Sequence, residues 1–462
     1  MLVGNKNLPK GVSMQNFNII IPNGALEILT RLEESGYEAY VVGGCVRDSL
    51  MGKIPDDWDI TTSALPNEVI EVFKGGQVIL TGLKHGTVTV RLNGKNYEVT
   101  TFRSEGKYLD SRHPSSVDFV RDIKEDLKRR DFTVNAMAYS PKRGLIDLYD
   151  GFLDLQNGTI RAVGVAEERF EEDALRILRG VRFVSSTGFD LDKNTLNAMI
   201  KKAELLQRIS VERIFNELDK LLIGEFAHKA LLTAPEIIFE IIPELEKCYN
   251  FNQHSKWHAY DVYKHTVFAI KGASAKRELK WCMLLHDIAK PQKFFLDDNG
   301  EGHFYGHADL SEEIAIKILK RLKAPTRLIE RVCFLVKNHD RPFPQNDLKL
   351  KLRLAEIGEE NARDLIGVKY ADNFAQGTLR AQEERKNIEE LEKRINGVFL
   401  SEKCMSIKDL AVDGNDVLLY GFKGKEVGEI LHGLFIDVLT CNIKNERASL
   451  LKSIEKRAKN RL

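Results

Sequence analysis

The sequence predicts an α+β protein, in which a head with a mixed sheet is followed by helices to the end of the chain. Strand-like alternation of apolar and polar residues and glycine-containing turns occur mainly before about residue 155. Beyond that point apolar residues recur at helical spacing. We predict four domains: a head at 1–155, a helical neck at 156–245, a histidine-rich helical domain at 246–375 and a helical tail at 376–462.

The composition fits a globular protein without a global attraction for nucleic acid. Its 462 residues suffice for about three or four domains, and its net charge is +1, so any contact with RNA must use local basic surfaces. The sequence has no apolar run of about 18 residues and no export leader, so we expect neither membrane insertion nor secretion. Six cysteines without a Cys-x-x-Cys motif fit free thiols in a reducing cytoplasm, the expected location.

Two helices and a hairpin frame the predicted sheet. Leucines at helical spacing follow Asn23, an N-cap candidate, and predict a helix that covers the sheet. Pro66 begins a second short helix. Residues 86–103 alternate, turn at an Asn-Gly pair and return, which predicts a hairpin. The polar run at 104–116 lacks periodicity and predicts a loop.

Residues 41–62 organise the head. An apolar strand runs into Gly43 and Gly44, and a short helical segment then carries Arg47 and Asp48. Glycines after a strand let backbone N–H groups approach a phosphate, which the helix N-terminus also attracts. Arg47 could bind the same phosphate through two hydrogen bonds. The stretch therefore predicts a phosphate-binding turn.

Carboxylates follow this turn. Asp57 and Asp59 are one residue apart, so on a strand they share a face, where they can hold Mg²⁺. A pair of such ions activates a hydroxyl and stabilises leaving pyrophosphate, which is the chemistry of nucleotidyl transfer. Glu98, on the return strand of the hairpin, could supply a third carboxylate or be an ordinary exposed strand residue. The alternative for the whole stretch, a glycine turn with a solvated acidic loop, does not explain why Arg47 lies between these features.

Two further charged runs predict helix faces. Arg130, Asp131 and Asn135 recur at helical intervals, which would gather them on one face. Further along, Asp173, Arg176, Arg179 and Arg182 follow at steps of three along one side of a predicted helix. An ordinary salt bridge explains only the first two of these four, and three arginines in line suit a triphosphate.

Asp173 and Arg176 could also read bases. Cytosine and adenine present an amine donor beside a ring nitrogen acceptor, whereas uracil and guanine present the reverse order. A carboxylate acceptor beside a guanidinium donor therefore fits C and A and rejects U and G. This pattern predicts a polymerase that selects bases with protein and needs no nucleic-acid template.

A second constellation lies in the histidine-rich domain. Histidines and aspartates on several helices can converge on one or two divalent metals, with water as the nucleophile for phosphoester hydrolysis. A lone histidine on an apolar helix is usually structural, but an adjacent His-Asp pair with distant partners favours a metal site. The histidines and aspartates of this pattern are His265, His286, Asp287, His307, His339 and Asp372.

The tail pattern allows two interpretations. Glycines at 421, 424 and 428 flank the start of a helix, and the closing run at 452–462 holds five basic residues and one acid. Both features suit a weak grip on an RNA backbone. A turn between helices and a frayed basic end explain them equally well.

With these motifs in hand, the region 40–224 resembles the class II nucleotidyltransferases, the bacterial tRNA CCA-adding enzymes and their poly(A) polymerase relatives. The specific motifs are 42–63, 129–138 and 172–183. The resemblance implies a two-metal transfer from CTP and ATP to the tRNA 3′ end, with pyrophosphate as product. It also implies an RNA-binding tail. Family members that add only CC are said to have a shortened loop in the head, and the loop here is of full length.

The resemblance implies a role for each motif residue. Asp57 and Asp59 would bind the catalytic metals, and Gly44 and Arg47 would contact the triphosphate. Phosphate and ribose would be bound by Arg130, Asp131 and Asn135. The bases of CTP and ATP would be read by Asp173 and Arg176, beside Arg179 and Arg182.

The histidine-rich domain resembles the HD phosphohydrolase superfamily. This resemblance implies four metal ligands, His265, His286, Asp287 and Asp372, with His307 and His339 as ligands of a second metal. Four alternatives stay open. An A-adding enzyme and a poly(A) polymerase share every head motif. A phosphohydrolase with the head as an RNA-binding module would not need the head carboxylates and arginines. A structural RNA-binding protein would show no metal-dependent turnover.

Overall fold

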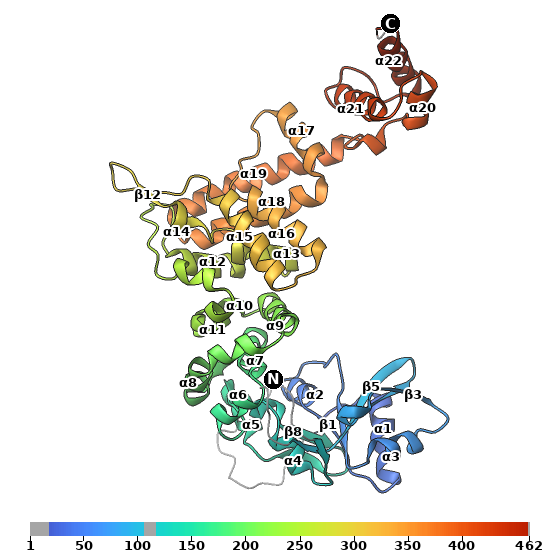
Figure 1. Ribbon diagram of the computed structural model, residues 1–462, viewed down its shortest axis with the longest axis vertical. Helices are drawn as coiled ribbons and strands as arrows, with labels where there is room; N and C mark the ends of the chain where they lie inside the picture. The colour runs from blue at the N-terminus through green and yellow to red at the C-terminus, as the bar shows by residue number, and fades with distance from the viewer. Residues whose placement is uncertain (1–17, 106–116, 461–462) are drawn as a thin grey trace. The chain divides into compact units, whose positions relative to one another are not determined.

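The structure is a computed structural model that describes residues 18–105 and 117–460 (Figure 1). The chain divides into two compact units, residues 1–243 and 244–462, and each is described by itself. Most of the predicted loop at 104–116 lies outside the described residues. The expectation of complete CCA addition depends partly on this loop. The described helices include none that is both long and apolar enough to cross a membrane. The four-domain division stays a prediction.

The first unit contains a mixed seven-stranded sheet of order β3-β4-β5-β2-β1-β8-β9. The neighbours β2 and β5 are parallel, and the other neighbouring pairs are antiparallel. This confirms the predicted α+β class with a mixed sheet. The strands are β1 (Ala39–Val42), β2 (Ile60–Thr62), β3 (Gln77–Gly82), β4 (Thr87–Leu92), β5 (Lys95–Thr101), β8 (Met137–Ser140) and β9 (Gly144–Asp147).

Helices lie on both faces of this sheet. On one face α1 packs against β1, β2 and α3. On the other, α4 contributes Ile123 and Leu127 to a buried cluster with Tyr40 and Phe102. The helices are α1 (Asn23–Glu34), α2 (Gly44–Leu50), α3 (Pro66–Val72), α4 (Ile123–Lys128) and α5 (Gly151–Asn157), and the short β6 (Arg103–Glu105) pairs with β7 (Val117–Phe119).

The predicted helices and hairpin are present, with one difference at the first helix. Asn23 lies inside α1 and is not its cap, because the Pro22 carbonyl already accepts the N–H of Leu26. Pro66 opens α3, and the Asn93-Gly94 turn, with positive φ at both residues, joins β4 to β5.

The rest of the first unit is almost entirely helical, as predicted. The two-residue strands β10 (Thr159–Ile160) and β11 (Asp190–Leu191) pair in parallel. The helices are α6 (Ala166–Glu172), α7 (Leu175–Thr187), α8 (Lys193–Lys201), α9 (Val211–Ile223), α10 (Ala227–Thr233) and α11 (Pro235–Ile241), and α7 packs against α9 and α10.

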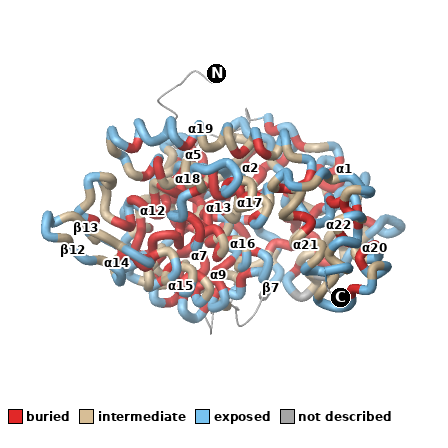
Figure 2. The backbone as a smooth tube through the Cα atoms, turned by 90° about the horizontal axis from the view of Figure 1, so that it is seen from above, coloured by how far each residue is buried: buried red, intermediate tan, exposed pale blue. Residues whose placement is uncertain are grey.

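The second unit is also helical, and its buried residues run through α12, α13, α16 and α18 (Figure 2). One small hairpin, β12 (Phe295–Leu296) with β13 (Gly302–His303), interrupts the helices. The helices are α12 (Val262–Gly272), α13 (Arg277–Leu285), α14 (Lys290–Lys293), α15 (His307–Arg321), α16 (Thr326–Asn338), α17 (Asp347–Ile357), α18 (Glu359–Gln376), α19 (Leu379–Ser401), α20 (Gly414–Leu419), α21 (Lys425–Leu439) and α22 (Arg447–Lys459).

A close backbone contact at the start of α5 allows a test of stability. A Cβ atom on Gly151 would lie 2.3 Å from the carbonyl oxygen of Thr133. We expect Gly151→Ala to lower the free energy of unfolding by about 1–3 kcal/mol, because the backbone of the short 3₁₀ turn at Thr133–Asn135 would have to move. Calorimetric unfolding measures this change. The control is Gly397→Ala in α19, where the added Cβ meets open space and helix propensity predicts no loss of stability.

Candidate active site

The head carboxylates lie where β1 ends and β2 begins, beside residues 98 and 99 within β5. Asp57 and Asp59 are exposed, and Trp58 between them is buried, so the two carboxylates share a side. They lie in the extended segment before β2, and not in the strand itself as predicted, because β2 pairing begins only at Ile60. The backbone still anchors this segment, since the N–H of Val42 donates to the Asp59 carbonyl at 3.0 Å.

Charge and register support the grouping of these acids. Although Asp59 reaches solvent, the protein atoms packed around its carboxylate remove part of its hydration and raise its pKa. The Arg130 charge opposes that rise, and the Asp57 charge adds to it. The parallel pair Ile60 and Val99 places Asp59, just before β2, beside Glu98 on β5. Glu98 is exposed, on the opposite face of β5 from Val99. These three oxygen-bearing side chains are of the type that binds hard divalent cations.

The glycine turn brings the backbone close to an arginine. Gly43 has φ +81°, a conformation that favours glycine, and a Cβ there would lie 3.0 Å from Nη1 of Arg130. Arg130 also donates to buried Asp126 at 3.3 Å, and its Nε is buried without a hydrogen-bond partner among the described residues. A half-buried guanidinium with an unpartnered donor beside an open backbone turn suits an anionic ligand.

Arg47 is held by other side chains of the predicted site. It donates to Oδ1 of Asn135 at 2.7 Å and to the Asp48 carboxylate at 2.8 and 3.0 Å. Its guanidinium lies 5.4 Å from the ring centre of Phe183 on α7. The predicted phosphate-binding segment therefore contacts α7, a helix of the predicted neck.

Asp131 connects the head to α7. Its carboxylate accepts from the Phe132 N–H at 2.8 Å, from Asn135 at 3.3 Å and from Nε of Arg179 at 2.8 Å. Burial favours the neutral acid, but the charge and hydrogen bonds of Arg179 outweigh it and lower the pKa of Asp131 to about 2. Asp131 thus remains ionised and holds the side chains of Asn135 and Arg179 in place.

The structure corrects the predicted helix through 130–135. Helix α4 ends at Lys128, and Phe132 then forms a β-bridge with Ala162 before a 3₁₀ turn. Backbone pairing with the segment around Ala162 outweighs local helix preference. Asp131 and Asn135 still meet, but through this turn and not through a helix face.

The predicted single helix carrying Asp173 and the arginines is also wrong. Helix α6 ends at Glu172, and Asp173 has extended dihedral angles, because its side chain accepts from the Leu175 N–H at 3.1 Å and breaks the helix. Asp173 pairs with Arg213 of α9 at 3.0 Å and not with Arg176.

Each of the three arginines on α7 already has an acidic or carbonyl partner. Arg176 is buried and donates to Glu172 at 2.6 Å and to the Arg129 carbonyl at 2.8 Å. Arg182 pairs with Glu217 at 2.6 Å, and the guanidinium groups of Arg179 and Arg182 lie over the Phe183 ring. The sequence analysis did not identify these partners, because most of them lie on other segments of the chain and spacing could not reveal them. Glu172 is the exception, since it lies four residues before Arg176, a spacing typical of a helical salt bridge.

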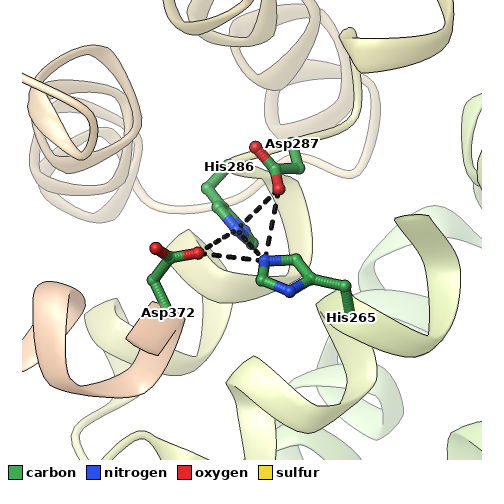
Figure 3. Close-up of side chains that lie close together, drawn as sticks. All are labelled: His265, His286, Asp287 and Asp372. Carbon is green, nitrogen blue, oxygen red and sulfur yellow. Dashed lines mark hydrogen bonds and ion pairs between the residues drawn. The ribbon is translucent and has the colours of Figure 1, made fainter. Parts of the chain in front are cut away.

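The histidine-rich domain contains a compact candidate metal centre (Figure 3). The four predicted ligands His265, His286, Asp287 and Asp372 each place a donor atom within 4.8 Å of the others. Nε2 of His265 lies 2.9 Å from Asp372 and 3.3 Å from Asp287, and Nε2 of His286 lies 3.1 Å from Asp287. Nδ1 of His286 faces the Met283 carbonyl at 2.9 Å, so its Nε2 is free to bind a metal.

A second cluster shares Asp287. Its other oxygen lies 3.2 Å from His307 and 3.5 Å from His339, the two residues predicted for a second metal. Burial would raise the pKa of Asp287, but His286 and Lys290 hold it well below its usual range. Lys290, 2.7 Å from Asp287, was not predicted, although its position three residues later on the chain was a readable signal. The donor set of imidazole and carboxylate fits transition metals such as Mn²⁺, Fe²⁺ or Zn²⁺.

Comparisons with known proteins identify the domains that contain these two groups of residues. Residues 39–161 match the family model of the poly A polymerase head domain, 188–248 match the probable RNA and SrmB-binding site of polymerase A, and 256–377 match the HD domain. Families with such head and HD domains use divalent metals.

Similarity to known relatives and to solved structures covers most of the chain. A CCA-adding enzyme of Geobacillus sp. (strain WCH70) is 38% identical over 410 residues, 88% of this chain and 90% of that protein. One from Streptococcus suis is 51% identical over 207 residues, 45% of this chain and 51% of that protein. The crystal structure of the Bacillus stearothermophilus CCA-adding enzyme in complex with CTP is 31% identical, with a TM-score of 0.70 over 95% of this chain and 97% of that one. The chain belongs to the family of the CCA-adding enzymes.

Proposed function

We propose that this protein adds C, C and A to the 3′ end of tRNA, with CTP and ATP as substrates and pyrophosphate as product. The observation that carries the proposal is the grouping of Asp57 and Asp59, just before β2, with the turn at Gly43 and the guanidinium groups of Arg47 and Arg130. The 38% identity to a CCA-adding enzyme over 88% of the chain supports the same activity.

The carboxylates Asp57, Asp59 and Glu98 would hold Mg²⁺, which when bound activates the attacking hydroxyl and stabilises the departing pyrophosphate. The residues of the chain orient the reactants. Gly43 leaves room for the triphosphate beside Arg130, and Arg47 is already directed by Asp48 and Asn135. A guanidinium held in place in this way loses little freedom when a phosphate binds.

Base selection would depend on Asp173 and Arg176. Arg176 is fixed at both ends, by Glu172 and by the Arg129 carbonyl, and Arg213 orients the Asp173 carboxylate. A donor and an acceptor held this rigidly can match the edges of cytosine and adenine without a template.

Asp173→Ala tests this selection. Loss of a hydrogen bond to a charged acceptor costs about 1.5–3 kcal/mol, so the preference for CTP over UTP should fall by about 10- to 150-fold. Competition between labelled CTP and UTP measures the ratio. Asp190→Ala, an exposed aspartate on β11, is the control, and an unchanged preference in Asp173→Ala would remove Asp173 from base reading.

Use of CTP separates CCA addition from the two related activities, those of an A-adding enzyme and of a poly(A) polymerase. The test is incorporation of labelled CTP and ATP, separately and together, into a tRNA transcript without its last three nucleotides, with Mg²⁺ present. We expect two C from CTP alone and one A after ATP is added. A-tailing without use of CTP would instead indicate an A-adding enzyme or a poly(A) polymerase.

A second function, metal-dependent phosphoester hydrolysis, is proposed for the second unit. It is supported by the convergence of His265, His286, Asp287 and Asp372 and by the match of residues 256–377 to the HD domain. The helical tail, with Lys452 and Lys456 exposed on α22, would contact the RNA backbone. Six unpaired cysteines and a tRNA substrate are consistent with a cytoplasmic location.

A further inference from the structure

The candidate metal centre of the second unit is open to solvent on one side. Asp372 has 30% of its side chain exposed, whereas the other three ligands drawn in Figure 3 have at most 1% exposed. Asp372 lies on α18, one helical turn before the end of that helix at Gln376. The Oε1 atom of Gln376 is buried without a hydrogen-bond partner among the described residues. The open side of the centre therefore lies along the end of α18, where an acceptor atom still lacks a donor.

A short segment before α12 borders this open side. Its His258 ring lies 5.0 Å from the ring of the candidate ligand His265. The N–H of Ala259 donates to the carbonyl of Gln376 at 2.9 Å, which attaches the segment to the end of α18. The segment thus connects the metal centre to the region where α18 ends and α19 begins.

Arg380, near the start of α19, contacts this segment. Its guanidinium carbon lies 4.2 Å from the centre of the ring of Trp257, the residue before His258. Stacking on an aromatic ring fixes the plane of a guanidinium group and leaves its N–H groups free to bind a phosphate. Arg380 is exposed and forms no ion pair with another described residue. It is therefore an oriented cation with unused donors.

The position of Arg380 within α19 also favours an anionic ligand. The helix begins at Leu379, so Arg380 lies in its first turn, which contains no acidic residue. The helix dipole places partial positive charge at this end and is unfavourable for a cation. Helix stability does not account for an arginine here, whereas a bound phosphate would offset both positive charges.

We propose that Arg380 binds a second phosphate group of the substrate whose phosphoester is hydrolysed at the metal centre. This inference rests on the hydrolysis proposed above for the second unit. In that reaction the oxygen of water forms a bond to phosphorus, the bond from phosphorus to the leaving oxygen breaks, and one water proton passes to solvent. Arg380 forms none of these bonds and holds the substrate. The substrate class is a nucleotide or an RNA strand with phosphates on both sides of one sugar, whose hydroxyl group would donate to Gln376.

The test compares uridine 5′-(p-nitrophenyl phosphate) with and without a 3′-phosphate, because the proposed head site rejects uracil. In the wild type the 3′-phosphate should lower KM at least about tenfold, the effect of a hydrogen bond between charged groups. Arg380→Gln should remove this preference without changing kcat or metal content. The matched control is Arg385→Gln, another arginine of α19, which lies 5.6 Å from the centre of the Tyr370 ring and should keep the preference.

Binding gives a second readout, without turnover. By calorimetry on the metal-free full chain, uridine 3′,5′-bisphosphate should bind the wild type at least about tenfold more tightly than uridine 5′-monophosphate, and Arg380→Gln should bind both equally. A 3′-phosphate capped as its methyl ester imitates the backbone of an RNA strand. A preference that survives the cap assigns the site to RNA, and a preference that the cap removes assigns it to free nucleotides.

The inference and the proposed hydrolysis fail in different ways. If the wild type hydrolyses both esters but Arg380→Gln keeps the preference and the tighter binding, Arg380 does not bind a second phosphate and the hydrolysis stands. If the wild type, loaded with Mn²⁺, hydrolyses neither ester, the proposed hydrolysis fails. The calorimetric comparison then decides the role of Arg380 by itself.

Discussion

Asp57→Asn is expected to reduce CTP incorporation at least about 10³-fold, which corresponds to roughly 4 kcal/mol of transition-state stabilisation. Asp57 is exposed beside Asp59 just before β2, and the pKa of Asp59 already responds to its charge. Replacing the carboxylate by an amide keeps the shape but removes one negative charge that would hold the catalytic metal. Single-turnover addition to tRNA lacking CCA measures the loss.

The control for this prediction is Asp118→Asn, an exposed aspartate on β7, which should add nucleotides at the wild-type rate. Binding of CTP, measured separately by calorimetry, should survive in Asp57→Asn because Arg47 and Arg130 remain. If RNA is still extended at the wild-type rate by Asp57→Asn, the head carboxylates are not the catalyst. The alternative of an RNA-binding head attached to a phosphohydrolase would then be favoured.

His286→Ala is expected to weaken metal binding and to reduce phosphoester hydrolysis in the second unit while leaving nucleotide addition intact. His286 is fully buried, its Nδ1 faces a carbonyl, and its Nε2 lies 3.1 Å from Asp287 and 3.6 Å from Asp372. Removing one of four ligands should lower metal affinity at least about tenfold. Mutation of residues that only hydrogen-bond to a metal ligand already lowers metal affinity by about this amount. Metal content by mass spectrometry and hydrolysis of bis-p-nitrophenyl phosphate are the readouts.

The matched control is His303→Ala, a half-buried histidine of the β12–β13 hairpin that lies outside the cluster and pairs with Asp297. It should retain both metal and hydrolysis. Loss of nucleotide addition in a folded His286→Ala protein would show that the two activities are not separable. Unchanged metal content in that variant would contradict the candidate metal centre.

The sequence predicted those parts of the fold and site that depend on local pattern. The Asn93-Gly94 turn gave its hairpin because two residues with positive φ suit that turn, and Pro66 began its helix. The four HD-type ligands are spread over more than 100 residues, yet their residue types and family resemblance were enough to group them.

What the sequence could not predict depends on tertiary partners. The helix expected through Asp131 is replaced by a bridge between Phe132 and Ala162, a pairing that helical spacing cannot reveal. The break at Asp173 follows from its side chain binding the Leu175 N–H, and its partner Arg213 lies 40 residues away. Burial of Arg176 between Glu172 and a backbone carbonyl likewise required three-dimensional contacts.

The central claim is that the protein itself selects C, C and then A. The most direct test is to incubate tRNA lacking its last three nucleotides with all four nucleoside triphosphates and Mg²⁺, and then to sequence the 3′ ends. We predict that the products end in CCA and stop there. Ends that carry a run of A, or that incorporate U or G as readily as C and A, would contradict the claim.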